Sequence, residues 1–156
     1  MRLMFWTGFW AFLSDQATKY LVVHWMNLIE LGQIDVAPPF LRFYMAWNRG
    51  VNFGLFANDS DAGRWVLIGI AVVISLFVIL WMRRDPPGKW GLICAGLLVG
   101  GALGNVVDRI LYGAVADFIN MSCCGINNPF AFNLADTWIF AGAFGLIFLG
   151  GTKKPS

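Results

Sequence analysis

The chain has 156 residues, of which 58% are hydrophobic and 13% charged, and its mean hydropathy is +0.66. A soluble domain of this length cannot hide so much apolar surface in one core, so the composition excludes an ordinary soluble protein and indicates a membrane protein. The net charge of +2 is too weak to indicate a protein that binds nucleic acid.

Four stretches approach the ~20 apolar residues that a helix needs to cross the hydrocarbon core of a bilayer. Each has a tryptophan at or near at least one end, as is typical of membrane interfaces. We therefore predict an α-helical integral membrane protein in which one domain, residues 1–156, contains four transmembrane helices. The predicted spans are residues 3–25, 65–82, 90–112 and 133–151.

The first span begins like a secretory signal peptide, because Arg2 precedes an apolar run. Asp15 and Lys19 interrupt that run, however, and no small-residue cleavage site follows it. We predict that this helix is retained.

Basic residues in short flanking segments predict the orientation, because such residues are kept in the cytoplasm. With both termini cytoplasmic, six of them share that side, and residues 26–64 and 113–132 form the two outer segments. The six are Arg2, Arg83, Arg84, Lys89, Lys153 and Lys154.

The first outer segment has the pattern of a small extracytoplasmic β-sheet. Residues 34–36 and 41–44 alternate in polarity on either side of Pro38-Pro39, and residues 48–54 are punctuated by glycine. We also expect an amphipathic segment that rests on the membrane surface. An apolar face, which is either buried at the interface or a lid, would contain Phe40, Phe43, Tyr44, Trp47, Phe53 and Phe56.

Acidic residues within or beside the spans are the main functional candidates, since an ionised carboxylate in hydrocarbon is costly and therefore rare. Asp15 lies in the outer half of its span, at a rise of ~1.5 Å per residue. Lys19 is one turn further on and shares its face, so the two can pair. The other three acids are Asp108, Asp117 and Asp136.

Two Asn-x-x-Asp units place polar side chains on common helix faces near the outer ends of the third and fourth spans. Asp117 follows the third span by a few residues, so acids from three spans converge at one level near the outer surface. Glycines on the third span predict close helix packing, whether or not they also serve the site. The residues concerned are Asn105 with Asp108, Asn133 with Asp136, and the glycines Gly96, Gly100, Gly101 and Gly104.

These residues fall into an ordered set of motifs that resembles the lipoprotein signal peptidase family, also called signal peptidase II. The resemblance spans nearly the whole chain, and the long glycine-asparagine-aspartate block is its most specific part. Asn52 and Ala116 depart from the family pattern. The motifs are Asp15-Gln16-Ala17-Thr18-Lys19, Asn48-Arg49-Gly50, the block from Gly100 to Arg109, Val115-Ala116-Asp117-Phe118 and Phe132-Asn133-Leu134-Ala135-Asp136.

The resemblance implies an aspartic endopeptidase of the bacterial inner membrane that works without metal or cofactor. It implies that Asp117 and Asp136 are catalytic and that the enzyme cuts prolipoproteins before a diacylglyceryl-modified cysteine, near the extracytoplasmic surface. Membrane lipids and the inhibitor globomycin are the other expected partners, and we expect a monomer. Supporting or substrate-contacting positions would be Asp15, Lys19, Asn48, Gly50, Gly101, Asn105, Asp108, Arg109 and Asn133.

Physical chemistry also favours paired carboxyls, because two close acids in a low-dielectric cleft cannot both ionise cheaply. Asp108 competes with Asp117 as the partner of Asp136. We favour Asp117, because a short loop outside the helix can aim it, and we expect Asp108 or Arg109 to belong to a polar network that orients the loop. Asn133 is expected to hydrogen-bond its neighbouring aspartate or the substrate backbone, or to cap the fourth helix.

Other functions fit the sequence less well. Intramembrane acids and a lysine also build ion or proton relays in transporters, but the second span offers only Ser75 as an inner polar step. The single histidine, His24, does not support a Cys/His metal site. Cys94 reads as a small buried hydrophobe, and Cys123-Cys124 suggests no role. A serine-lysine peptidase and a non-catalytic scaffold are also disfavoured.

Overall fold

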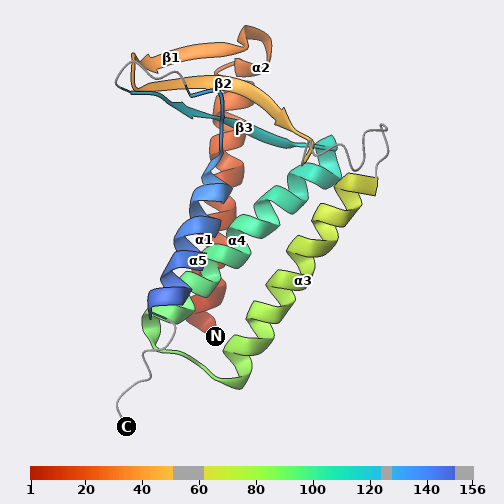
Figure 1. The fold of residues 1–156 in the computed structure, drawn as a ribbon, viewed down its shortest axis with the longest axis vertical. Coiled ribbons are helices and arrows are strands. Elements are labelled where there is room, and N and C mark those ends of the chain that lie inside the picture. The colour runs from red at the N-terminus through yellow and green to blue at the C-terminus, as the bar shows by residue number, and fades with distance from the viewer. Residues whose placement is uncertain (51–61, 124–127, 150–156) are drawn as a thin grey trace.

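The computed structural model describes residues 1–50, 62–123 and 128–149. In these residues four helical segments run side by side, and a three-stranded sheet lies across one end of them (Figure 1). The segments are α1 (Arg2–Lys19), which continues into the π-helix η1 (Tyr20–Trp25), α3 (Ala62–Arg84), α4 (Lys89–Tyr112) and α5 (Leu134–Leu149). A one-turn helix, α2 (Leu28–Leu31), leads from η1 into the sheet.

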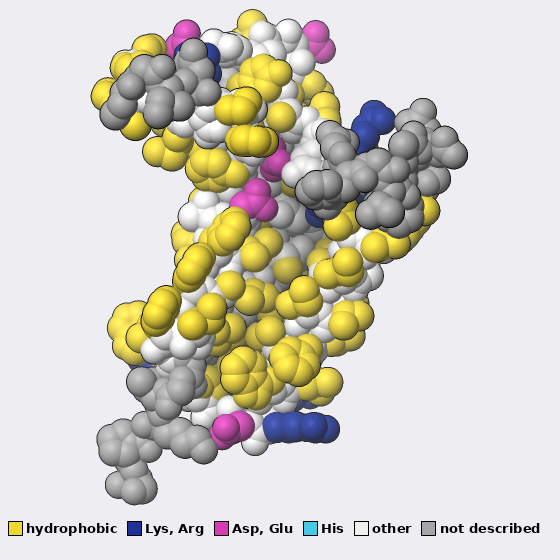
Figure 2. Space-filling view, in the orientation of Figure 1, with side chains coloured by type: hydrophobic (Ala, Val, Ile, Leu, Met, Phe, Trp, Pro, Cys, Tyr) yellow, Lys and Arg dark blue, Asp and Glu magenta, His cyan; other side chains and the backbone are white. Residues whose placement is uncertain are grey.

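Wherever the structure describes them, all four predicted spans are helical except at Asn133, which directly precedes α5. By length and composition, α3 and α4 can cross a membrane, and α5 is a shorter apolar helix. Apolar side chains cover the face of the helices seen in Figure 2, and on α3 the exposed ones include Val66, Ile70, Val73 and Phe77. Such a surface suits contact with lipid, and the count of four crossings stays a prediction.

Helix α4 is the centre of the bundle, because α1, α3 and α5 all pack against it. Its glycines make the contacts close: a methyl group at Gly96 would meet the carbonyl of Met4 on α1, and one at Gly101 would meet the carbonyl of Ala135 on α5. The predicted role of the glycines in close packing is therefore confirmed. Small residues are a common means of helix association in membranes.

We expect Gly100→Ala to lower the stability of the bundle, because the added methyl group would overlap the backbone of Gly8 on α1. Overpacking of this kind costs about 1–3 kcal/mol. Gly69→Ala on α3 is the matched control, since nothing lies within 4 Å of its added methyl group. Thermal unfolding of both variants in detergent micelles measures the difference, and equal melting temperatures would contradict the packing role.

The sheet consists of β1 (Gln33–Ala37), β2 (Leu41–Asn48) and β3 (Val115–Met121), antiparallel in the order β1-β2-β3. The first two strands confirm the predicted small sheet. The third strand corrects the prediction of a loop around Asp117. Residues 115–118 are all buried, so the strand shows no alternation of polar and apolar residues that the sequence could reveal.

One face of the sheet packs on the end of the first helical segment. Val22, Val23 and Leu28 form a buried cluster with Ala116 and Phe118 of β3. A second cluster, in the bundle, is built around Ala95, Leu98 and Val99 of α4. The sheet is thus seated on the helices by its own small core, and β3 is held at the level where the helices end.

The start of α1, the end of α3 and the start of α4 lie at the end of the molecule opposite the sheet (Figure 1). Four of the six cations that predicted the orientation belong to these ends. Six residues named in the sequence analysis lie outside the described residues: Asn52, Phe53, Phe56, Cys124, Lys153 and Lys154. The predicted lid and the division into membrane sides stay predictions.

Candidate active site

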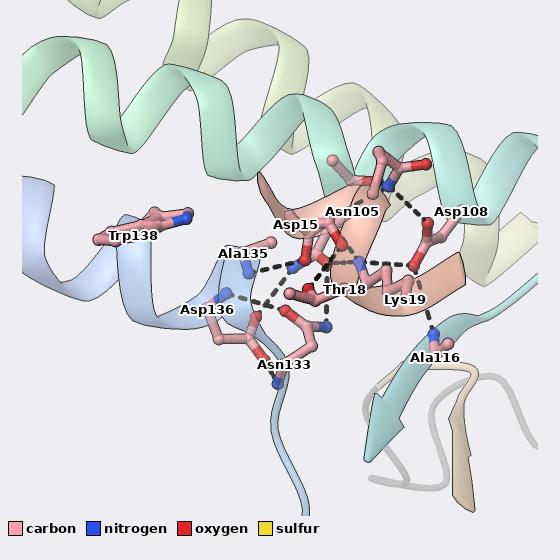
Figure 3. A network of polar contacts seen from close by, with 12 residues as sticks. Asp15, Thr18, Lys19, Asn105, Asp108, Ala116, Asn133, Ala135, Asp136 and Trp138 are labelled. Atoms are coloured by element: carbon pink, nitrogen blue, oxygen red, sulfur yellow. Dashed lines mark hydrogen bonds and ion pairs between the residues drawn. The ribbon is translucent and has the colours of Figure 1, made fainter. Parts of the chain in front are cut away.

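A buried ion cluster joins the first helix to α4. The Nζ atom of Lys19 lies 2.8 Å from Asp15 Oδ2 and 2.7 Å from Asp108 Oδ2, and both carboxylates are almost fully buried. Figure 3 shows the lysine between the two acids. The predicted pairing of Asp15 with Lys19 is confirmed, and Asp108 is a second partner of the same cation.

Amide groups complete the hydrogen bonding of this cluster. Gln16 Nε2 donates to Asp15 Oδ2 at 3.1 Å and to Asp108 Oδ1 at 3.0 Å, while Lys19 Nζ donates to Asn105 Oδ1 at 3.2 Å. Gln16 was not predicted as a site residue, although its position three residues before Lys19 places the two on one face of the helix. Lys19 and the Gln16 amide thus each contact both of the buried acids, Asp15 and Asp108.

The ion cluster also reaches α5 and β3. The N–H of Ala135, in the first turn of α5, donates to Asp15 Oδ1 at 2.9 Å. The N–H of Ala116 on β3 donates to Asp108 Oδ2 at 3.4 Å. Asp108 therefore contacts the backbone of the residue before Asp117, which agrees with a network that orients the Asp117 segment.

Asp117 projects from β3 and is only 3% exposed. Asn48 Nδ2 donates to its Oδ2 at 2.9 Å, and Asn133 Nδ2 donates to its Oδ1 at 2.6 Å. The N–H of Gly50 donates to Asn48 Oδ1, which leaves the NH2 group of Asn48 facing Asp117. Gly50 has a φ of 111°, and a methyl group there would overlap Leu67 of α3. Glycine is therefore required at this turn.

Asp136 lies in the first turn of α5 and is half-buried. Its Oδ2 accepts the backbone N–H of Asn133 at 3.3 Å, and its own N–H donates to Asn133 Oδ1 at 2.9 Å. This reciprocal pair is a capping box, in which Asn133 is the N-cap residue. Asn105 Nδ2 donates to Asp136 Oδ1 at 2.8 Å, so α4 holds the other carboxylate oxygen.

Asn133 is therefore the residue that brings Asp117 and Asp136 together. Its side-chain amide donates to Asp117 and also to Asn105 Oδ1 at 3.1 Å, while its backbone N–H and side-chain oxygen contact Asp136. Both functions predicted for Asn133, a cap and a hydrogen-bond partner of aspartate, occur at once. The two acids arrive from elements that are distant in the sequence and meet at one fully buried amide.

The environment of Asp117 favours its protonated form. Burial raises the pKa of Asp117 from 3.8 to about 6, and the nearby charge of Asp136 acts in the same direction. The hydrogen bonds from Asn48 and Asn133 act in the opposite direction but are outweighed. The folded protein therefore binds more protons than the unfolded chain between these two values. The contribution of Asp117 to stability is greatest at low pH and is lost as the pH rises through about 6.

We expect infrared spectra of the purified protein to show a carboxylic acid band that disappears with a midpoint near pH 6. The same band should be absent from Asp117→Asn and present in Asp35→Asn, a control on the exposed strand β1. A titration of the Asp117 band near the ordinary value of 3.8 would contradict the assignment.

Arg109 adds positive charge beside the two acids. Its charge interacts with Asp117, Asp136 and Asp108, and its Nη1 donates to the carbonyl of Asn105 at 3.3 Å. Its Nε is buried and has no hydrogen-bond partner among the described residues. In the same part of the chain, no group of three or more His, Cys, Asp or Glu side chains is arranged to hold a metal ion.

The structure thus brings all the predicted site residues of the described part into two connected zones. Asp15, Lys19 and Asp108 form the ion cluster, and Asn105 links it to the pair of acids. Gly101 lies where α4 crosses the start of α5. The roles of the individual residues in catalysis remain predictions.

Comparisons with known proteins identify the family of this chain. The model of the family described as signal peptidase (SPase) II matches residues 8–150. The chain belongs to the signal peptidase II family. A lipoprotein signal peptidase of Methylobacterium radiotolerans is 44% identical over 135 residues, which are 86% of this chain and 77% of that protein. One of Alteromonas mediterranea is 37% identical over 96% of this chain and 82% of its own length.

This signal peptidase II chain is also similar in fold to solved structures. One, described as a bacterial membrane enzyme at 1.9 Å resolution, has a TM-score of 0.81 and 26% identity, covering 99% of this chain and 96% of the other. A second, at 2.3 Å, has a TM-score of 0.78 at the same identity, covering 100% of this chain and 95% of the other. The predicted family and the prediction of a membrane peptidase are confirmed, and transport is no longer an alternative.

Proposed function

We propose that this member of the signal peptidase II family is an aspartic endopeptidase that removes the signal peptide from diacylglyceryl-modified prolipoproteins. It cuts just before the lipidated cysteine. The relatives named lipoprotein signal peptidase support the substrate class. The contacts of Asn133 with Asp117 and with Asp136 carry the proposal for the mechanism, because they bring two carboxyl groups to one amide.

The different environments of Asp117 and Asp136 give the two acids different roles in the reaction. The raised pKa of Asp117 makes it the group that keeps the shared proton, while Asp136, which is less deeply buried, acts as the base. Asp136 takes a proton from a water molecule whose oxygen attacks the scissile carbonyl, and Asp117 polarises that carbonyl. When the carbon–nitrogen bond breaks, the amine leaves with a proton from the pair.

Arg109 is the best candidate for a substrate contact. Its guanidinium lies in the field of both acids, and its buried Nε has no partner among residues 1–50, 62–123 and 128–149. A buried donor without a partner is costly, so a carbonyl oxygen of a bound peptide would satisfy it. Asn48 and Asn105 keep the catalytic oxygens in place from β2 and α4.

The location of the site matches a substrate that is anchored in lipid. We place the enzyme in the bacterial inner membrane with both termini in the cytoplasm, supported by the cations at the end opposite the sheet. The acids lie at the sheet end, where water reaches the bilayer surface. Acyl chains of the substrate contribute ~0.8 kcal/mol per buried methylene. Globomycin should bind at the same two acids, and we expect the enzyme to act as a monomer.

Mass spectrometry of a lipidated precursor tests this function. The purified protein, in micelles, should convert the precursor into two products separated at the bond before the diacylglyceryl cysteine. The same precursor without its lipid is the control and should be cut far more slowly, because it lacks the acyl contribution to binding. Cleavage at another bond, or equal cleavage of the two precursors, would contradict the proposal.

A further inference from the structure

A short ladder of backbone hydrogen bonds joins β3 to the segment that leads into α5. Ile119 donates to the carbonyl of Phe132 at 2.8 Å and accepts the N–H of Phe132 at 3.0 Å, and Phe118 also donates to that carbonyl at 3.1 Å. Phe132 directly precedes Asn133. The strand that carries Asp117 is therefore paired, two residues beyond it, with the residue that leads into the capping box of Asp136.

The side chain of Asn120 adds further hydrogen bonds between β3 and the segment that leads into α5. It is only 4% exposed, and its Nδ2 donates to the carbonyl of Asn128 at 2.7 Å and to the carbonyl of Phe130 at 2.8 Å. Its Oδ1 accepts the hydroxyl of Ser122 at 3.4 Å. Both N–H groups of one buried amide are thus used to hold residues 128–130 against β3.

We propose that Asn120 is a positioning residue for the peptidase reaction, which clamps the segment before α5 to β3 and so fixes Asp136 relative to Asp117. The proposal rests on the function proposed above. Asn120 and Asp117 belong to the same strand, and the clamped segment ends at Asn133, which contacts both acids. The clamp, the Ile119 to Phe132 ladder and the Asn133 amide form one continuous connection.

The contacts of Asn120 separate this role from a general role in folding. β3 itself is held by its pairing with β2 and by the buried cluster around Phe118, and α5 is held by α4. Among the described residues, the side-chain amide donors of Asn120 reach only the segment between these two elements. Its removal leaves the sheet and the bundle supported and loosens the connection that aligns the acids.

Alignment has a large effect on rate, because a misplacement of about 1 Å can cost 10²-fold in turnover. We expect Asn120→Ala to lower kcat per folded molecule by at least about tenfold, with KM for the lipidated precursor changed by less than about threefold. The acyl chains and the peptide would still bind, but the carboxyl groups would be paired less often. Met121→Ala is the control on the same strand, because the Met121 side chain is exposed, and its kcat should stay within about threefold of wild type.

The pH dependence of kcat gives a readout that simple loss of stability does not move. Two interacting carboxyl groups give a bell-shaped plot of kcat against pH. Separating the groups weakens their coupling, so the pH range over which kcat is high should be narrower for Asn120→Ala than for wild type. The charged groups around Asp117 are Asp136, Lys19 and Arg109, and the substitution alters none of them. Thermal unfolding of each variant gives the folded fraction by which kcat is corrected.

A corrected kcat for Asn120→Ala equal to that of wild type would overturn the proposal. A lower kcat whose pH profile is as wide as that of wild type would also overturn it. The two proposals fail in different ways. If the wild-type protein does not cut the precursor, the proposed function falls and the role of Asn120 falls with it. If wild type and Asn120→Ala cut equally well while Asp117→Asn does not, only the role of Asn120 falls.

Discussion

We expect Asp117→Asn and Asp136→Asn each to abolish cleavage of a diacylglyceryl-modified precursor while the protein still folds. Asparagine keeps the shape of aspartate, but it can neither hold the shared proton nor accept one from water. General acid or base catalysis contributes about 10²–10⁴-fold per group, so turnover should fall by at least that much. Mass spectrometry of the intact precursor and its two products measures the loss.

The control for this pair is Asp35→Asn, the same change on exposed β1, where the carboxylate lies 3.9 Å from Arg42. It should cut at the wild-type rate. Asn48 and Asn133 donate to Asp117, and the carbonyl oxygen of an asparagine can still accept one of these bonds. The dead variants should therefore remain folded in thermal unfolding. Wild-type turnover by either variant would end the assignment of the two acids.

Lys19→Met should be the most destabilising single change in the helices. The lysine contacts Asp15 and Asp108, which are 0% and 1% exposed, so its loss leaves two buried carboxylates with no cation in contact. Breaking a buried ion pair by removing one partner costs about 3–5 kcal/mol. Unfolding in mixed micelles of increasing denaturing detergent measures the change in the free energy of unfolding.

Lys89→Met is the matched control, because Lys89 is exposed at the start of α4 and lies over the ring of Trp90. It should change the free energy of unfolding by less than about 1 kcal/mol. Adding Asp108→Asn to Lys19→Met should recover part of the loss, because it removes one of the two uncompensated charges. Equal stability of Lys19→Met and Lys89→Met would show that the ion cluster does not support the fold.

The helices and much of the site could be predicted from the sequence because their signals are local. Apolar runs mark the helices, and the spacing of Asp15 from Lys19 places both on one helix face. The spacing of Asn133 from Asp136 predicts a cap at the start of α5, and the capping box is there. Each of these features depends on residues within four positions of one another.

The parts that sequence reasoning missed depend on partners far away in the chain. β3 pairs with β2, about seventy positions earlier, and burial on both faces removes the alternation that identifies a strand. Gln16 and Asn120 look like ordinary polar residues until the fold brings Asp108 and the carbonyl of Phe130 to them. Neither the direction nor the partner of such an amide can be deduced from spacing.

One of the two acids belongs to the sheet, and the other belongs to the helices. In the proposed mechanism, the two carboxyl groups are therefore aligned only while β3 remains seated across the end of the bundle. A movement of the sheet away from the helices would draw these carboxyl groups apart and, in the proposed mechanism, would stop cleavage without a change at either residue. A ligand that binds between the sheet and the helices would then inhibit the enzyme without contacting either acid.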